Sequence, residues 1–87
     1  MTKQEIIKKT NEFLVEEYEK NPALLTPEAR FREDLDLNSL DYVDLMVTVK
    51  RVFGIMPAPV EMTLVVTLGD FYDFIERKFS ELASADE

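Results

Sequence analysis

Ser39 is the residue whose type and position could support chemistry in this chain. It stands in residues 35–41, which read Leu-Asp-Leu-Asn-Ser-Leu-Asp, where a polar loop gives way to an apolar run at helical spacing. The chain contains no histidine and no cysteine, so no imidazole or thiolate is present to assist a serine nucleophile. A hydroxyl at a helix start without such a base suits a residue to which another group is attached. Serine is also a common helix cap, so the surrounding sequence must decide between the two roles.

Several segments resemble the acyl carrier protein family. In that family a Phe-x-x-Asp-Leu-Gly-x-Asp-Ser-Leu-Asp segment contains the serine that receives 4′-phosphopantetheine, and residues 31–41 read Phe-Arg-Glu-Asp-Leu-Asp-Leu-Asn-Ser-Leu-Asp. Residues 43–45 and 52–54 resemble the family's Val-Glu-Leu and the end of its second helix. Residues 66–70 resemble the Thr-Val-Gly-Asp that opens its last helix. The resemblance covers nearly the whole chain.

The resemblance implies an all-α fold, a small four-helix bundle with a long loop between helices 1 and 2 and a short helix 3. We expect a single carrier domain over residues 1–82 and a frayed tail at residues 83–87. By the resemblance, a transferase moves 4′-phosphopantetheine from coenzyme A onto the Ser39 hydroxyl. The thiol of that group then carries acyl intermediates as thioesters for fatty acid or polyketide-type synthesis. Ser39 is a substrate in this scheme, and the chain is not an enzyme.

The composition limits the classes of function. With 87 residues, 46% of them hydrophobic and 32% charged, the chain suits one globular domain. Without cysteine it has no disulfide and no cysteine-based zinc site, and we predict no metal site. The sequence has no apolar run of about eighteen residues and no signal-peptide pattern, so we expect a cytoplasmic protein that does not bind a membrane. A formal net charge of -8 argues against nucleic acid as a partner.

Acidic residues cluster around Ser39. Residues 33–44 contain five acidic side chains and no basic one. Their negative potential would steer a basic surface towards the start of the second helix. We therefore expect a monomeric carrier whose partners are a phosphopantetheinyl transferase and acyl-transfer or ketosynthase-type enzymes with basic patches. The surface that we expect them to recognise comprises Asp34, Asp36, Asn38, Leu40, Asp41, Val43, Asp44, Val47, Lys50 and Arg51.

The hydrophobic pattern predicts the elements that position this surface. Residues 3–19 are predicted to form an amphipathic helix, which Asn21 and Pro22 end. Residues 22–38 are loop-like, although Thr-Pro-Glu at residues 26–28 has the chemistry of a capped helical turn.

The second helix has clear start and stop signals. Asn38 and Asp41 fit a capping box, and Gly54 marks the end. Between them, apolar residues recur at helical spacing and predict the buried face, which comprises Leu45, Val49, Val52 and Phe53 with Tyr42 and Met46 beside them.

The last part of the chain begins with a proline-interrupted linker at residues 55–59. Residues 60–66 are apolar and β-branched, so propensity alone permits a strand, but the resemblance implies a short third helix there. Thr67 and Asp70 fit a second capping box, followed by a final helix to about residue 82. Its apolar face is predicted to comprise Phe71, Phe74, Ile75 and Phe79.

The chain departs from the family pattern beside Ser39 and at the far end of the second helix. Asp36 replaces the usual glycine, in a turn where aspartate tolerates a positive φ better than most residues. Asn38 replaces the usual aspartate and removes one negative charge. Lys50 and Arg51 replace acidic residues, while Val43 and Val47 remain as apolar contacts opposite the buried face. These differences suggest a specialised carrier with its own synthase partners.

Calcium binding is the first alternative. Asp34, Asp36 and Asn38 occupy positions 1, 3 and 5 of an EF-hand loop. Position 6 is Ser39 in place of glycine, and position 12 is Leu45 in place of a bidentate glutamate. The loop therefore predicts at most loose binding of a divalent cation.

Two further alternatives share the helical fold. Paired carboxylates can act as acid and base, but this requires burial that separates their pKa values and a pocket for substrate. The acids here lie on an expected exposed turn of a small domain. A non-enzymatic helical interaction module would have the same fold, and modification with coenzyme A would distinguish it from a carrier.

Overall fold

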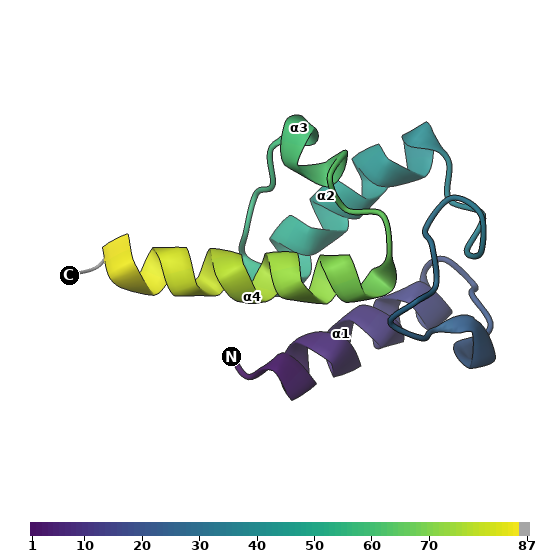
Figure 1. The fold of residues 1–87 in the computed structure, drawn as a ribbon, viewed down its shortest axis with the longest axis horizontal. Helices are drawn as coiled ribbons and strands as arrows, with labels where there is room; N and C mark the ends of the chain where they lie inside the picture. Colours follow the sequence, from purple (N-terminus) through teal and green to yellow (C-terminus); the bar gives the residue numbers. More distant parts are fainter. Residues whose placement is uncertain (86–87) are drawn as a thin grey trace.

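The computed structural model describes residues 1–85 and confirms the predicted all-α architecture (Figure 1). In Figure 1, α1 and α4 lie side by side, α2 and α3 lie above α4, and the loop between α1 and α2 closes one end of the molecule. In chain order the elements are α1 (Lys3–Glu16), the short 3-10 helix η1 (Pro22–Leu24), α2 (Ser39–Phe53), α3 (Pro59–Met62) and α4 (Leu68–Ala85).

Helix α1 ends three residues earlier than the predicted boundary at residue 19. Its start is fixed by a capping box between Thr2 and Glu5. At its end, Glu19 adopts a left-handed conformation with φ 56°, and the Lys20 N–H donates to the Leu14 carbonyl over 2.9 Å. A residue outside the helical region turns the chain away from the axis, so the pattern of apolar residues overestimated the helix length.

At residues 26–28, where a short helical turn was expected, the chain forms a single turn in which the Ala29 N–H donates to the Thr26 carbonyl over 3.0 Å, and it does not continue into a helix. A 3-10 helix forms earlier, at η1, where the Asn21 side chain accepts a hydrogen bond from the Ala23 N–H over 3.0 Å. The segment from Pro27 to Ala29 is held against the start of α4. The Leu68 N–H donates to the Ala29 carbonyl over 2.8 Å, and the Gly69 N–H donates to the Pro27 carbonyl over 2.9 Å. A side chain at residue 69 would lie 3.0 Å from that carbonyl, so glycine permits the close approach.

Helix α3 is shorter than expected and begins one residue before the predicted segment of residues 60–66. It covers only Pro59–Met62. The β-branched residues that follow pair with the loop before α2, because the Phe31 N–H donates to the Val66 carbonyl over 3.0 Å and Thr67 forms an isolated antiparallel bridge with Arg30. The β-branched residues after α3 therefore form a short antiparallel bridge with the loop before α2, in keeping with their preference for extended backbone. The bridge provides a hydrogen-bond partner for the Val66 carbonyl, which lies outside helix α3.

Helix α4 starts with the predicted Thr67–Asp70 capping box. It continues to Ala85, past the predicted end at residue 82. Residues 83–85 thus belong to the helix, and the rest of the expected tail, residues 86 and 87, lies outside the described residues.

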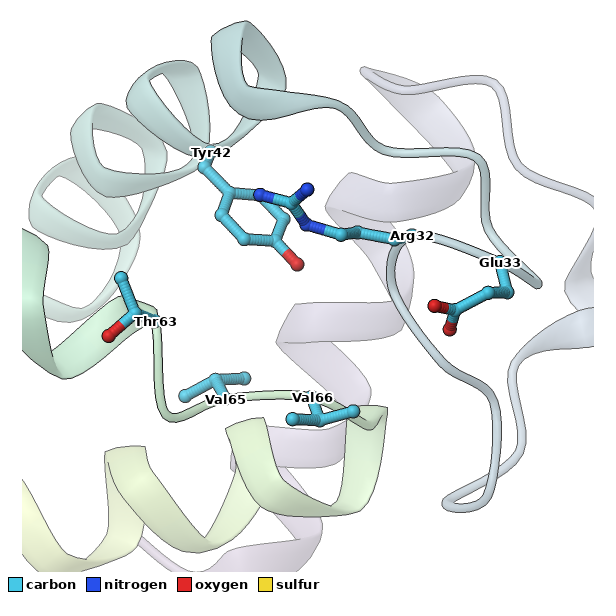
Figure 2. Close-up of a pocket in the computed structure, with 6 residues that line it drawn as sticks. All are labelled: Arg32, Glu33, Tyr42, Thr63, Val65 and Val66. Carbon is cyan, nitrogen blue, oxygen red and sulfur yellow. The ribbon is translucent and has the colours of Figure 1, made fainter.

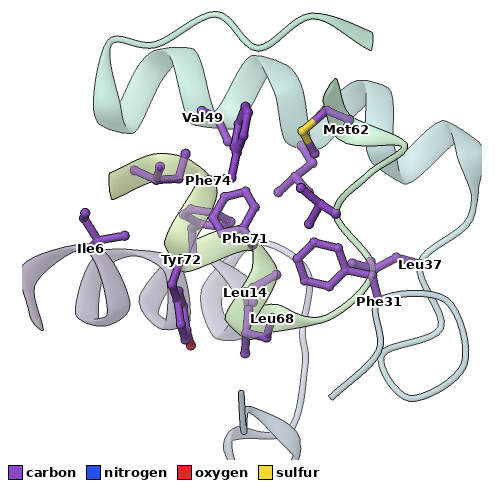
Figure 3. Packing of buried hydrophobic residues seen from close by; sticks show 14 of the residues in the cluster. Ile6, Leu14, Phe31, Leu37, Val49, Met62, Leu68, Phe71, Tyr72 and Phe74 are labelled. Carbon is purple, nitrogen blue, oxygen red and sulfur yellow. The ribbon is translucent and has the colours of Figure 1, made fainter. Parts of the chain in front are cut away.

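A single cluster of buried apolar side chains joins α1, α2, α3 and α4 to the loop before α2 (Figure 3). Phe71 of α4 lies at its centre, with ring centroids 6.5 Å from Phe13 and 5.8 Å from Phe31. Leu35 and Leu37 of the loop are also buried. Because these three loop residues are anchored in the core, the chain reaches the start of α2 in a fixed position.

Candidate functional site

Ser39 is the first residue of α2 and is exposed. Neither its hydroxyl nor its backbone N–H has a hydrogen-bond partner among the described residues. The adjacent Asn38 is the helix cap, so the serine is not needed for that role. The residue is therefore accessible to another molecule, and it lies at the positive end of the helix dipole.

The predicted capping box at the start of α2 is confirmed. The Asn38 side-chain oxygen accepts hydrogen bonds from the N–H groups of Leu40, over 2.9 Å, and Asp41, over 3.1 Å. In return, the Asp41 carboxylate accepts the Asn38 N–H over 2.9 Å. The amide oxygen thus does the structural work that an aspartate would do at this position, without its charge.

The turn before the cap requires a left-handed residue. Asp36 has φ 54°, which is the conformation expected where the family carries glycine. The next residue, Leu37, returns to the core and donates its N–H to the Phe31 carbonyl over 2.9 Å. The replacement of glycine by aspartate therefore preserves the turn.

The acids predicted around Ser39 do not all remain available to a partner. Asp34 accepts the backbone N–H of Arg30 over 2.8 Å and the guanidinium Nε of the same residue over 3.2 Å. These two hydrogen bonds, the backbone one first, hold the pKa of Asp34 below its usual value of 3.8. Asp41 is engaged in the capping box, while Asp36 and Asp44 are exposed.

The outer face of α2 presents the predicted apolar contacts to solvent. Leu40 is 80% exposed, and Val43 and Val47 are more than half exposed. Leu45 and Val49, on the opposite face, are buried. Ser39 therefore stands at one end of an exposed stripe that combines apolar side chains with the carboxylate of Asp44.

Lys50 and Arg51 differ in their surroundings. Arg51 donates from Nη2 to the Glu17 carboxylate of α1 over 2.5 and 2.6 Å, and so its charge is paired within the molecule. Lys50 is exposed and has no ion-pair partner among the described residues. Of the two basic replacements, Lys50 is thus the one whose charge is exposed without an ion pair to a described residue.

A cavity of about 220 Å³ is lined in part by Tyr42 (Figure 2), which follows Ser39 by one helical turn in α2, and we call it the cavity beside Ser39. Tyr42 forms one wall, and the guanidinium of Arg32 lies over its ring, 5.3 Å from the centroid. The connection between α3 and α4 forms the floor, and Glu61 of α3 holds that connection near α4 through an ion pair with Lys78 over 2.5 Å. The lining residues are Arg32, Glu33, Tyr42, Thr63, Val65 and Val66.

The geometry does not favour the calcium alternative. Of its three potential ligands, Asp34 is bonded to Arg30 and the Asn38 oxygen caps α2. Among the residues that the structure describes, no group of three or more acidic side chains lies together in a way that could hold a metal ion.

Comparison with known proteins decides the family. Residues 12–75 match the family model described as phosphopantetheine attachment site. Acyl carrier protein 2 of Ralstonia nicotianae is 39% identical over 70 residues, which cover 80% of this chain and 86% of the relative. The chain belongs to the acyl carrier protein family. Acyl carrier proteins of Thermosynechococcus vestitus and Rickettsia typhi are 33% and 34% identical, over 90% and 91% of this chain and 96% and 92% of theirs.

The family's prosthetic group is 4′-phosphopantetheine, held covalently, and the start of α2 fits it. A phosphodiester needs a free hydroxyl for attachment and tolerates its own negative charge best near unpaired backbone N–H groups. Ser39 would supply the hydroxyl and an N–H without a partner among the described residues, and the residue is exposed. When bound, the group supplies a thiol, which this cysteine-free chain otherwise lacks.

Members of the family act as carriers, and they interact with phosphopantetheinyl transferases and acyl-transfer enzymes. None of the helices within residues 1–85 has the length and apolar character needed to cross a membrane.

The sequence did not indicate the cavity beside Ser39. Tyr42 could have been placed there, because it follows Ser39 by three residues and such pairs share a helix face. Arg32, Val65 and Val66 come from segments that meet only through the pairing of the two loops. No periodic pattern marks that pairing.

Proposed function

We propose that Ser39 is the residue that carries 4′-phosphopantetheine, and that the chain transports acyl groups as thioesters for fatty acid or polyketide-type synthesis. One observation carries this proposal. Within the region matched by the family model, Ser39 is exposed at the first residue of a long helix, and its hydroxyl has no intramolecular partner in the described part of the chain.

The attachment makes Ser39 the nucleophile of a reaction that another protein catalyses. Its Oγ forms a bond to the phosphorus of coenzyme A that bears the pantetheine. The bond from that phosphorus to the bridging oxygen of the diphosphate breaks, and 3′,5′-ADP leaves. The serine proton passes to a base on the transferase, since this chain offers no histidine to accept it.

Intact mass measurement tests the assignment. The protein is incubated with coenzyme A and a broad-specificity phosphopantetheinyl transferase, and we expect a gain of one phosphopantetheinyl group. Ser39→Ala should gain none, whereas Ser80→Ala, which removes another exposed serine, should be modified like the wild type. Modification of the Ser39→Ala variant, or an unmodified wild type with several transferases, would contradict the proposal.

Asn38 is proposed to make modification by a general transferase slower. An aspartate there would keep the hydrogen bonds to Leu40 and Asp41 and add a charge for a basic partner. We expect Asn38→Asp to be modified faster at low salt and the difference to shrink at high salt. Equal rates for the two proteins at low salt would show that the transferase does not detect this charge.

Lys50 is proposed to bias the choice of synthase partner. Its exposed cation would repel the basic patch of an enzyme adapted to an acidic helix, while Asp44 attracts it. We expect Lys50→Glu to raise the rate with a housekeeping ketosynthase at low salt. Arg51→Glu is the informative control, because it breaks the contact with Glu17 and tests loss of structure separately from surface charge. No gain from Lys50→Glu would remove the support for a specialised partner.

A further inference from the structure

Tyr42, which lines the cavity, links it to Ser39, because both residues belong to the first turns of α2. Residues three apart on a helix have Cβ atoms about 5–6 Å apart on one face, so Tyr42 stands immediately beyond Ser39. The ring of Tyr42 forms a wall of the cavity (Figure 2). If Ser39 carries the group as proposed, the lining of the cavity decides which acyl groups it accepts.

Arg32 brings an unpaired cation to this cavity, although the next two residues in the sequence, Glu33 and Asp34, are acidic. Both acids form ion pairs with Arg30, whose Nε lies 3.5 Å from the Glu33 carboxylate and 3.2 Å from the Asp34 carboxylate. The guanidinium of Arg32 turns instead over the ring of Tyr42, at 5.3 Å from the centroid. It has no hydrogen bond or ion pair with any described residue. Its five N–H donors are therefore available to a ligand oxygen.

The rest of the lining is mainly apolar and small. Val65 is buried, and Val66 lies beside it on the floor of the cavity (Figure 2). The Thr63 hydroxyl donates to the Val60 carbonyl over 2.6 Å, so its proton is already used. Tyr42 has a hydroxyl without a partner among the described residues. At about 220 Å³ the cavity is smaller than the ~300–1,000 Å³ typical of ligand pockets, so it suits a short group.

The charge of Glu33, which also lines the cavity, limits which oxygen can bind. Arg30 carries one positive charge and pairs with both Glu33 and Asp34, so these three side chains keep a net negative charge. That charge would repel a carboxylate placed near Arg32. A neutral oxygen accepts a hydrogen bond from the guanidinium without that repulsion.

We propose that Arg32 and Tyr42 select short acyl groups that carry a neutral oxygen on the β-carbon, over unsubstituted alkyl groups of the same length. The guanidinium donates to the β-oxygen, and the valines and the tyrosine ring contact the carbons. Arg32 is therefore a residue that determines cargo specificity, and Tyr42 positions it.

Protection of a matched pair of thioesters tests this selection. The holo protein is loaded with acetoacetyl or butyryl groups, which have the same number of carbons and differ at the β-carbon. Cleavage by hydroxylamine is measured for each and divided by the rate for the same thioester on free pantetheine, which corrects for intrinsic reactivity. We expect acetoacetyl to be protected more than butyryl, and Arg32→Gln to reduce that preference about fivefold, which corresponds to about 1 kcal/mol.

Arg77→Gln is the matched control, because Arg77 also lies over an aromatic ring, that of Phe74 at 5.7 Å, but not in this cavity. It should leave the preference unchanged, and Arg32→Lys should restore part of it. Backbone amide NMR shifts of Tyr42, Val65 and Val66 should differ between the two loaded forms in the wild type and not in Arg32→Gln. An unchanged preference in Arg32→Gln, or an equal loss in Arg77→Gln, would overturn the proposal.

Two further measurements separate the selection by Arg32 from the requirement for a neutral oxygen and from the role of Ser39. Malonyl, which carries a β-carboxylate, should be protected less than acetoacetyl, and the reverse order would refute the requirement for a neutral oxygen. Intact mass verifies loading before each measurement, so a chain that cannot be loaded contradicts the role of Ser39 and not the selection. In that case soluble pantetheine thioesters are titrated into the apo protein. Equal NMR shifts of Tyr42 and Val65 with acetoacetyl and butyryl forms would then overturn the selection.

Discussion

Helices α2 and α4 begin with the same kind of capping box, but the start of α2 is exposed and the start of α4 is buried. Each has a capping box, Asn38 with Asp41 in one and Thr67 with Asp70 in the other. The residue after the cap is Ser39 in α2 and Leu68 in α4, and the first is exposed while the second is fully buried.

The backbone N–H groups show the same contrast. At α4 the N–H groups of Leu68 and Gly69 donate to the carbonyls of Ala29 and Pro27. At α2 the N–H of Ser39 has no partner among the described residues. A capped helix start is therefore accessible to another molecule only where the surrounding fold leaves it uncovered, and a similar cap at α4 lies against the core.

The largest expected effect comes from truncating the residue after each cap. Leu68→Ala should lower the free energy of unfolding by about 2–5 kcal/mol, because it opens a cavity in the core. Ser39→Ala should change it by less than about 0.5 kcal/mol, because the hydroxyl contacts nothing that supports the fold. Urea unfolding followed by far-UV circular dichroism measures both. A loss above about 1 kcal/mol in Ser39→Ala would mean that the serine has a structural role.

Removal of the two cap side chains should change the free energy of unfolding by more similar amounts. Asn38→Ala and Thr67→Ala should each cost about 1 kcal/mol of unfolding free energy. The cost should be larger for Asn38, whose oxygen accepts two backbone N–H groups, than for Thr67, whose hydroxyl oxygen accepts one. Asn38→Ser serves as the control, since serine is also a good cap and should recover most of the loss. A greater loss from Thr67→Ala would reverse the expected order.

The turn that leads into α2 should tolerate glycine. Asp36→Gly should raise the free energy of unfolding by a few tenths of a kcal/mol, because glycine adopts φ 54° without the strain of a side chain. Gly54→Ala is the reverse test, because it introduces a side chain at a position with positive φ and should lower the free energy of unfolding. Gly54 has φ 73° and no atom within 4 Å of an added Cβ, so alanine there should cost about 1 kcal/mol for conformational reasons alone. A destabilised Asp36→Gly variant would show that the aspartate side chain stabilises the turn.

The smallest expected effect depends on pH. Hydrogen bonds from Arg30 lower the pKa of Asp34 from 3.8, so its contribution to stability is complete above that value and is lost as pH falls through the lower pKa of the folded state. The stability difference between the wild type and Asp34→Asn should therefore shrink on acidification from about pH 6 to about pH 2. Urea unfolding across this range measures it. A difference that grows on acidification would contradict this assignment.

The start of α2 could be predicted from the sequence because its determinants are local. Asn38 bonds to N–H groups two and three residues away, Asp41 bonds back over three, and Asp36 occupies a turn position that favours left-handed residues. The buried apolar face of α2 could likewise be predicted from helical periodicity alone. The position of Ser39 as the first residue of α2 could be predicted for the same reason, because a capping box depends only on residues close together in the sequence.

The tertiary structure decided which of these local features are exposed and what lies beside them. The turn that local chemistry suggested at residues 26–28 forms, but the carbonyls of Pro27 and Ala29 accept hydrogen bonds from the start of α4, and the turn does not continue into a helix. The β-branched run after α3 pairs with Phe31, more than thirty residues earlier, and so completes the cavity beside Ser39. These contacts join segments far apart in the chain, and they depend on the packing of the whole core. Periodicity and capping patterns describe only neighbours along the chain, so the sequence alone determined the helix start, and the packed fold made it an accessible site.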